Sequence, residues 1–414
     1  MEPAPPETSG TGETSTPGAV TPPRANQLRT RAVHAVEDPS LAVRPLSDPI
    51  APSSVFAFRD PEVADRRWAA DPPEANYGRD GTPNVRTLER AVADLEGADD
   101  AYAAASGMAA IALVFLSHLR TGDHVVVSAD AYCEARSLLT EELAGFGVGS
   151  SFATGSDPAA VAAAITAETK LVYAETIANP AMTLADLPGL AAVAAERGVL
   201  LCVDNTLATP ALCRPIEHGA DLVVHSATKF LGGHHDLTAG VVAGRRDLIR
   251  RIRRCGQLYG PTLGAMDAWL VLRGIRTLAP RIAWMSESAR LVADFLGGHP
   301  AVARVRYPGS ANGGEADLAR RLLPNGSGGM LAFDLHGGAP AAAAMIRGLA
   351  MIPFALSLGG TSTTVCYPPR ASSVWTDGGC ADGPSGSPTL RLSVGLEGAD
   401  DLIADLTQAL AGLA

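Results

Sequence analysis

One lysine, Lys229, stands in the stretch HSATKFLGGH at residues 225–234, after two hydroxyl side chains and before two glycines. The run DLVV that precedes it is apolar enough to form a buried strand. Lysine is rarely buried unless it is paired. A lysine that is desolvated, or that lies near other cations, has a lowered pKa and becomes a nucleophilic amine. Lys229 is therefore a candidate for forming an imine.

Other candidates lie near the ends of neighbouring predicted strands. Asp204 ends the run LLCVD, and Lys229 follows DLVVH, so both should meet at the edge of a parallel sheet where ligands bind. Pyridoxal phosphate needs such a pair, an imine-forming lysine and an acid on its ring nitrogen. It also needs a phosphate cup, for which residues 106–108 at a helix start and the hydroxyls of Ser226 and Thr228 are suited. Alone, Lys229 would be interpreted as a solvated loop lysine and Asp204 as a strand cap; the combination favours the cofactor site.

Composition restricts the function classes. The net charge of -11 argues against nucleic-acid binding. No apolar run reaches membrane-spanning length, and no signal-peptide pattern opens the chain. The six cysteines show no CxxC spacing, which favours reduced thiols and a cytoplasmic location.

The positioning elements form an alternating strand and helix pattern. The segments DHVVVSA, KLVYAET, VLLCVDN and DLVVHSAT are short apolar runs, typical of parallel strands buried on both faces. Helical stretches lie between them, such as LPGLAAVAAERG, which should stop at Gly198. This alternation predicts an α/β fold with a mostly parallel sheet covered by helices.

The pattern predicts four segments. Residues 1–25, rich in Pro, Gly, Ser and Thr, should be a disordered tail. Residues 26–80 should form an extended N-terminal arm, and 81–281 the cofactor-binding domain. From 282 the pattern changes to a smaller α+β domain, 282–414, with a helix ESARLVADFLGG, strands GGMLAFDL and PTLRLSVGLE and a final helix. The segment 377–388 is loop-like by composition.

Several motifs together resemble the Cys/Met-metabolism enzymes that depend on pyridoxal phosphate: cystathionine γ-synthase, cystathionine γ-lyase, methionine γ-lyase and the homoserine sulfhydrylases. They occur in family order over about residues 29–414: NYGRDGTPNVRTLERAVADLEG, ASGMAAI, YAETIANPAM, VDNTLATP, HSATKFLGGHHDLTAGVV, AWLVLRGIRTL, GSGGMLAFDL, SLGG and LRLSVGLEGADDLIADL. The resemblance implies the fold type I, or aspartate-aminotransferase-like, architecture. It also implies a homotetramer made of two dimers with shared active sites.

The resemblance also implies roles for individual residues. Lys229 matches the Schiff-base lysine, and Asp204 the partner of the pyridine nitrogen. Tyr132 matches the tyrosine that stacks on the cofactor and can donate a proton. The phosphate ligands would be Gly107, Met108, Ser226 and Thr228, with Tyr77 and Arg79 reaching the neighbouring subunit's phosphate; Asn179 would lie near the ring hydroxyl, and Arg391, with Ser357 beside it, would hold the substrate α-carboxylate.

Taken singly, these residues also have ordinary interpretations. Tyr132 could be a packed aromatic, Arg79 a surface residue and Arg391 a solvent-facing strand residue, while Asn179 before a proline is a common turn signal. The HHD at 234–236 could suggest a metal ligand set, but it follows the glycine turn of the family motif, so no metal site is predicted.

Departures from the family pattern cluster on the substrate side. Tyr132 is followed by Cys133, Glu134 and Ala135 instead of the usual Gly-Gly-Thr type. Leu356 stands where cystathionine-handling members often carry a glutamate, and 361–388 has lost its usual residues. The expected activity is γ-elimination or γ-replacement on a γ-substituted L-amino acid, of the methionine or O-acylhomoserine type. The alternatives are a specialised γ-lyase for a non-sulfur, for example halogenated, amino acid, and a cystathionine or cysteine β-lyase.

Two further classes fit less well. An inactive cofactor-holding scaffold is disfavoured because Lys229, Asp204, Tyr132 and Arg391 are all present. An aminotransferase is disfavoured because the motifs match transaminases poorly.

Overall fold

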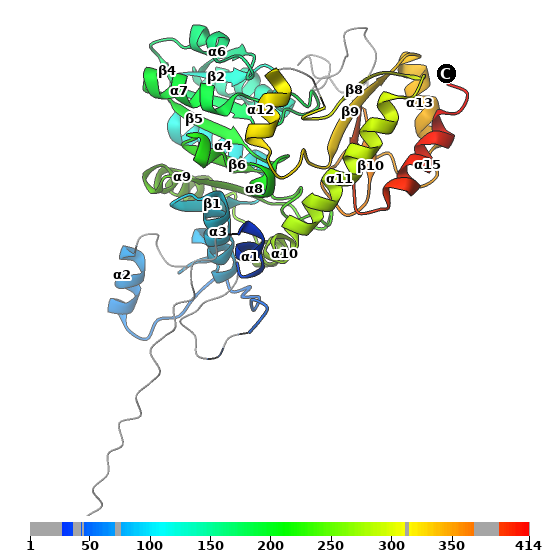
Figure 1. The fold of residues 1–414 in the computed structure, drawn as a ribbon. Helices are drawn as coiled ribbons and strands as arrows, with labels where there is room; N and C mark the ends of the chain where they lie inside the picture. The colour runs from blue at the N-terminus through cyan, green and yellow to red at the C-terminus, as the bar shows by residue number, and fades with distance from the viewer. Residues whose placement is uncertain are drawn as a thin grey trace, which may run out of the picture.

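The structure is a computed structural model, and it describes residues 27–35, 43, 45–70, 76–310, 314–367 and 389–413. The predicted disordered tail 1–25 and the predicted loop 377–388 lie outside these residues. Figure 1 shows two sheets side by side, the larger one surrounded by helices and the smaller one nearer the C-terminus.

The larger sheet has seven strands in the order β1-β7-β6-β5-β4-β2-β3. Its pairs β2–β3, β2–β4, β4–β5 and β5–β6 are parallel, and β7 runs antiparallel to both of its neighbours. The mostly parallel sheet predicted from the apolar runs is therefore confirmed. The strands are β1 (Asp100–Ala104), β2 (His124–Ser128), β3 (Gly149–Ala153), β4 (Thr169–Glu175), β5 (Leu200–Asp204), β6 (Leu222–His225) and β7 (Gly240–Gly244).

Helices cover both faces of this sheet, which is why its central strands are apolar throughout. On β5, Leu201 and Val203 pack into one core and Cys202 packs into the other. α4 and α9 contribute to the second core, whereas α3, α7 and α10 contribute to the first. The helices and helical turns of this domain are α3 (Pro83–Glu96), α4 (Gly107–His118), α5 (Cys133–Ser137), η2 (Leu138–Glu142), η3 (Leu143–Phe146), α6 (Pro158–Ala164), α7 (Leu187–Arg197), α8 (Thr209–Leu212), η4 (Pro215–His218), α9 (Arg246–Tyr259) and α10 (Ala265–Ile275).

Local sequence signals set the ends of the helices. The Ser106 hydroxyl accepts a hydrogen bond from Ala109 N–H at 3.1 Å and caps the start of α4. α7 begins after Asp186, which caps Gly189 N–H, and ends at Gly198 in the left-handed conformation. The predicted helix stop at Gly198 is confirmed.

The described part of the N-terminal arm holds two short helices, α1 (Leu28–Val33) and α2 (Pro61–Ala69), and the turn η1 (Gly78–Asp80). Ala32 of α1 lies in the main core, whereas α2 lies away from the body of the molecule (Figure 1). The Asn84 side chain accepts from Ala51 N–H and donates to Asp48 and Pro49, which fixes part of the arm against α3.

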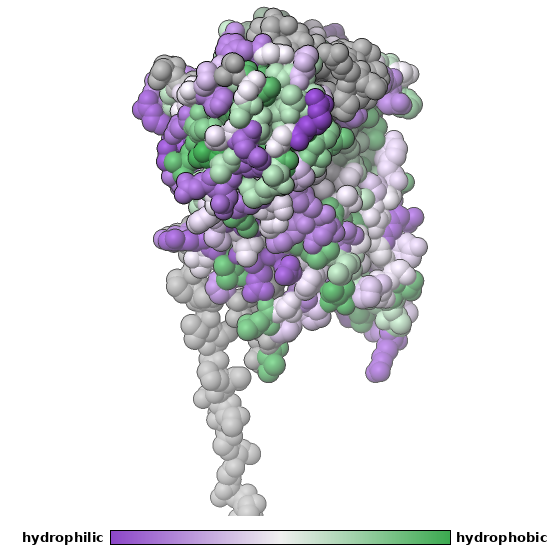
Figure 2. All heavy atoms as spheres, turned by 90° about the vertical axis from the view of Figure 1, so that its right-hand side faces the viewer, coloured by the Kyte–Doolittle hydropathy of each residue, from purple (hydrophilic) through white to green (hydrophobic). Residues whose placement is uncertain are grey.

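The smaller domain has a four-stranded antiparallel sheet in the order β10-β11-β9-β8, as the predicted α+β pattern requires. Its strands are β8 (Val302–Arg306), β9 (Met330–Leu335), β10 (Thr364–Cys366) and β11 (Leu390–Ser393); its helices are α13 (Gly338–Gly348) and α15 (Ala399–Leu410). The helix α12 (Gly314–Leu322) lies between β8 and β9 in the sequence, but its residues Leu318, Ala319 and Leu322 belong to the core of the larger domain. Hydrophobic and hydrophilic residues are interspersed over this side of the molecule (Figure 2).

The long helix α11 (Leu278–Gly297) joins the two domains. Leu278 and Ile282 at its start belong to the core of the larger domain, whereas Val292 and Leu296 near its end belong to the core of the smaller one. The helix predicted from residue 287 thus begins earlier, and the predicted boundary at 281/282 falls inside a continuous helix. Among the described residues, no helix is long and apolar enough to cross a membrane.

Candidate functional site

The predicted site residues Asp204 and Lys229 lie at and just after the carboxyl ends of the neighbouring strands β5 and β6. Asp204, the last residue of β5, accepts hydrogen bonds from Thr206 N–H at 2.8 Å and from the Tyr173 hydroxyl at 3.3 Å. Burial raises the pKa of the Asp204 carboxyl group, and the Thr206 and Tyr173 donors oppose that rise. The acid is thus desolvated but supplied with donors that favour its charged form.

Lys229 lies in the loop after β6 and is partly buried. Its Nζ donates to the Ser357 hydroxyl at 3.3 Å, so the two domains meet at this lysine. Burial, and then the positive charge of Arg391, lower the pKa of the Lys229 amine. A Cβ atom on Gly359 would lie 2.8 Å from Phe230 N, so only glycine allows this loop to approach the lysine main chain so closely.

An anion cradle lies at the start of α4. The first turn of α4 carries N–H groups that no preceding carbonyl of the helix can accept. A Cβ atom on Gly107 would lie 2.6 Å from Ser226 Cβ and 2.8 Å from Ser226 Oγ, so only glycine lets the Ser226 side chain come this close to the helix start. Gly240 on β7 has a matching role, because its Cβ would lie 2.0 Å from Ser106 O. These groups fit a phosphate.

Two other predicted phosphate ligands have less open surroundings. Thr228 Oγ1 already donates to Ala239 O at 3.2 Å and accepts from Ala239 N–H at 3.0 Å. Met108 is partly buried at the second position of α4, where its own N–H lies in the first turn of the helix. The main-chain group of Met108 and the Ser226 hydroxyl are therefore better placed to bind an anion than the Thr228 hydroxyl.

The predicted substrate-side residues form a connected set. Arg391 on β11 is 5% exposed, and its Nη1 donates to Asn179 Oδ1 at 2.8 Å while its Nη2 donates to Leu356 O at 3.0 Å. Both acceptors are uncharged, and each of these nitrogens keeps a second N–H. The planar guanidinium group is thus fixed in place and still able to take a carboxylate.

Tyr132 comes directly before α5 and is partly buried. Burial raises the pKa of its hydroxyl to about 12. Its main-chain N–H donates to Glu175 Oε1 at 2.6 Å, and Asn179 N–H donates to Glu175 Oε2 at 3.2 Å. Glu175 was missed as a site residue from the sequence; the available signal was a carboxylate at the end of an apolar strand.

Tyr77 and Arg79 are not brought into contact with the other site residues within the described part of this single chain. The Arg79 guanidinium lies 5.6 Å from the centre of the Tyr77 ring, and both side chains are exposed. The described residues contain no group of three or more His, Cys, Asp or Glu side chains arranged to hold a metal. His234, from the HHD stretch, instead pairs its Nδ1 with Gly232 O at 2.8 Å.

Comparisons with known proteins identify the family to which the chain is similar. The L-methionine gamma-lyase of Porphyromonas gingivalis is 39% identical over 392 residues, which are 93% of this chain and 97% of that protein. The O-succinylhomoserine sulfhydrylase of Pseudomonas aeruginosa is 39% identical, with 87% of this chain and 90% of that protein covered. The crystal structure of cystathionine gamma synthase from Xanthomonas oryzae pv. oryzae matches with a TM-score of 0.84 and 34% identity, and the match covers 94% of this chain and 98% of that one.

The model of the family described as Cys/Met metabolism PLP-dependent enzyme matches residues 29–411. The resemblance, the fold class, the cofactor and the prediction of an enzyme acting on a small amino acid are confirmed. The predicted class of reaction, γ-elimination or γ-replacement, is confirmed as well. The chain belongs to the Cys/Met metabolism family of pyridoxal-phosphate-dependent enzymes.

Proposed function

We propose that this enzyme acts on a γ-substituted L-amino acid of the methionine or O-acylhomoserine type, and that Lys229 is the residue that binds pyridoxal phosphate as a Schiff base. The observation that carries the assignment of Lys229 is its environment in the loop after β6. The side chain is partly buried, and within the described residues its hydrogen-bond partner is the neutral Ser357 hydroxyl. Burial and the nearby Arg391 lower the pKa of its amine. These are the properties of an amine that reacts near neutral pH.

The other cofactor roles follow from the same site. Asp204 is the partner of the ring nitrogen, and Gly107 and Met108 offer main-chain N–H groups to the phosphate. Of the two nearby hydroxyls, that of Ser226 is better placed to bind the phosphate than that of Thr228, which already bonds to Ala239. Tyr132 packs against the ring, and Asn179 lies beside it. When bound, the cofactor withdraws electrons from the substrate's Cα.

Protein groups supply the proton transfers. Burial and the nearby Arg391 lower the pKa of the Lys229 amine, which favours its uncharged form, and in this form it can take a proton from Cα and then act at Cβ. The Tyr132 hydroxyl, with a pKa of about 12, stays protonated at neutral pH and can donate to a leaving group at Cγ. Arg391 holds the substrate carboxylate, with Ser357 beside it.

Leu356 supports the choice of an uncharged γ-substituent. Its side chain is 59% exposed, while its carbonyl holds Arg391. An apolar side chain gives a distal ammonium group no partner, whereas it can contact an uncharged γ-substituent. Cystathionine should therefore be a poorer substrate than methionine or an O-acylhomoserine. A γ-halogenated amino acid remains the alternative for this pocket.

The test is to measure kcat/KM for methionine, O-acetylhomoserine, cystathionine and a γ-halogenated amino acid, following 2-oxo acid, ammonia and thiol release. The variant Leu356→Glu should shift preference toward cystathionine, and the smaller substrates should lose about 1–3 kcal/mol of transition-state binding. A wild-type enzyme that prefers cystathionine would overturn this substrate assignment. If the 2-oxo acid released from cystathionine is then pyruvate, the result would support the second candidate, a β-lyase, as in the 39% identical cystathionine beta-lyase MetC of Bacillus subtilis.

Tyr77 and Arg79 are exposed, so they can reach the active site of a neighbouring subunit. The assembly proposed is a homotetramer of two dimers that share their active sites. The location proposed is the cytoplasm. In this assembly the arm 26–80 reaches the neighbouring subunit, 81–281 binds the cofactor and 282–414 binds the substrate. Mixing inactive Arg79→Ala with inactive Lys229→Ala should restore activity, because one site of each hybrid dimer is then wild type at both positions. No recovery despite demonstrated subunit exchange would contradict a shared site.

A further inference from the structure

Glu175 is a buried carboxyl group with no role assigned so far. It ends β4, is 6% exposed, and stands in register with Asp204 on the adjacent strand β5. Burying a carboxyl group is costly unless hydrogen bonds compensate. Both of its oxygens are used: Oε1 accepts from Tyr132 N–H at 2.6 Å, and Oε2 accepts from Asn179 N–H at 3.2 Å.

The two main-chain groups that Glu175 holds belong to different segments. Tyr132 precedes α5, after β2, whereas Asn179 follows β4 itself. From Asn179 the contacts continue into the smaller domain, because its Oδ1 accepts from Arg391 and Arg391 in turn donates to Leu356 O. One carboxyl group thus connects the segment of the ring-packing tyrosine with the arginine that holds the substrate.

The chemistry of the contact requires a carboxyl group. A carboxylate presents two acceptor oxygens, whereas an amide presents one acceptor and one donor. Glutamine at this position would place its NH₂ group against the N–H of either Tyr132 or Asn179. Burial, and then the neighbouring Asp204, raise the pKa of the Glu175 carboxyl group, while the two main-chain N–H groups oppose the rise.

We propose that Glu175 is a positioning residue of the active site, whose carboxyl group sets the place of Asn179, and through it the Arg391 guanidinium, relative to Tyr132. The inference rests on the proposed role of Arg391 as the ligand of the substrate carboxylate. It extends that role, because it identifies Glu175 of the larger domain as the group that keeps Arg391 in position relative to the cofactor site.

The experiment measures the dissociation constant of norleucine, which has an α-carboxylate but no γ-leaving group, by calorimetry on cofactor-loaded protein. Glu175→Gln should weaken norleucine binding by roughly tenfold or more, since a hydrogen bond in a charged set is lost. Glu168→Gln, a surface carboxylate bonded to Thr166, is the matched control and should bind as wild type. A general loss of structure would instead lower the cofactor content and leave binding per loaded site unchanged, which would overturn the proposal.

A double-mutant cycle tests the path through Asn179. Asn179→Ala should weaken norleucine binding as Glu175→Gln does, and the combined variant should be little worse than either alone, because both changes release the same arginine. Fully additive losses would contradict the inference. Where Glu175→Gln does not fold, Glu175→Asp, which is too short to reach both N–H groups, replaces it in the cycle with the same expectation.

Arg391→Ala distinguishes a failure of the role proposed for Arg391 from a failure of the role proposed for Glu175. If it leaves norleucine binding unchanged, the proposed role of Arg391 is wrong. If it weakens binding but Glu175→Gln does not, only the role of Glu175 is wrong.

Discussion

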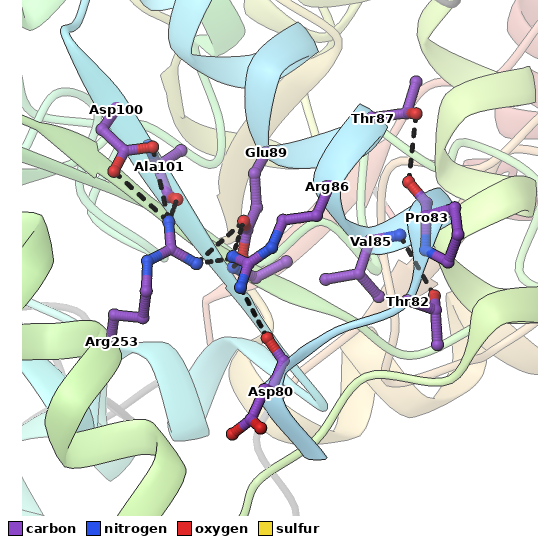
Figure 3. A network of polar contacts seen from close by, with 11 residues as sticks. Asp80, Thr82, Pro83, Val85, Arg86, Thr87, Glu89, Asp100, Ala101 and Arg253 are labelled. Atoms are coloured by element: carbon purple, nitrogen blue, oxygen red, sulfur yellow. Dashed lines mark hydrogen bonds and ion pairs between the residues drawn. The ribbon is translucent and has the colours of Figure 1, made fainter. Parts of the chain in front are cut away.

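Two of the regions that bury positive charges treat those charges in opposite ways. In the first, Arg253 of α9 lies against Glu89 of α3, with N–O distances of 3.0 and 3.2 Å, and against Asp100 of β1 at 3.3 and 3.4 Å (Figure 3). Arg86 also pairs with Glu89 at 2.6 Å, and Arg253 donates to Ala101 O at 2.7 Å. In this network, acids balance the buried guanidinium groups.

In the second region, the candidate site, the cations have neutral partners. Lys229 donates to a hydroxyl, and Arg391 donates to an amide oxygen and a main-chain carbonyl. The two cations also repel, which contributes to the lowered pKa of Lys229. A buried cation without an acid is costly in a structural role. In an active site it leaves the charge available for a substrate carboxylate. Arg281, which is 4% exposed and donates to Phe230 O and Gly274 O, shows that neutral partners alone do not mark a functional cation.

The largest expected effect is that of Lys229→Ala, which should lower turnover by at least about 10²–10⁴-fold, since proton transfer alone is worth that much. The chain has only two lysines, Lys170 and Lys229. Borohydride reduction followed by peptide mapping should therefore place the cofactor label on Lys229 alone. Lys170→Ala, at a residue 49% exposed near Asp123, is the control and should keep full activity. A label on Lys170 would show that Lys229 is not the Schiff-base lysine, and the functional contrast between the two regions would then fail.

Arg253→Ala should have the reverse profile, a large loss of stability with little loss of catalysis per folded molecule. Removing one member of a buried ionic set leaves the others unpaired, which typically costs about 3–5 kcal/mol. Chemical denaturation measures the loss. The control is Arg290→Ala, whose pairs with Glu287 and Asp294 are exposed and worth about 0–1 kcal/mol. A strongly lowered kcat in folded Arg253→Ala protein would show that the network is not purely structural.

The two regions also differ in how well the sequence predicts them. The central strands, Lys229 and Asp204 were predictable because continuous apolar runs mark strands buried on both faces, and because ligands gather where such strands end. β3 lacked this signal, since it is an edge strand with the polar sequence GSSFA and is largely exposed. The long α11 was also predicted too short, because its first half packs in the larger domain and so does not share one apolar pattern with the rest.

Contacts made across long sequence separations were beyond sequence reasoning. The bond from Arg391 to Asn179 joins residues 212 positions apart, and the link from Tyr132 to Glu175 joins residues 43 apart. The motifs indicated that Arg391 and Asn179 belong to one site, but not that they touch. Glu175 was missed because a carboxylate at the end of an apolar strand is a weak signal, and because its partners are two main-chain N–H groups, which have no side-chain signature in a sequence.

Tyr173→Phe should have a smaller effect, which concerns the hydrogen bond to Asp204. The change removes the hydroxyl that donates to Asp204, so the pKa of Asp204 should rise further and its charged form should be less available to a ring nitrogen. The affinity for pyridoxal phosphate should fall by about 1.5–3 kcal/mol, the usual worth of a hydrogen bond to a charged group. Titration of cofactor-free protein measures it. Tyr307→Phe, whose hydroxyl bonds to Ser286 O and Gly328 O, is the control and should keep the cofactor affinity.

The smallest effect concerns the charge of Lys229 itself. In cofactor-free protein, its lowered pKa makes the amine neutral at a lower pH than an ordinary lysine, whose pKa is about 10.4. The rate of acetylation by a trace reagent, mapped for Lys229 as a function of pH, should therefore reach its midpoint below that value. Arg391→Gln removes the positive charge that helps to lower the pKa, so the midpoint should move upward. It should not return fully to the ordinary value, because burial, the larger cause, remains. A midpoint for Lys229 at or above that of an ordinary lysine would mean that an acid balances this amine, and the contrast with the Arg253 network would then be lost.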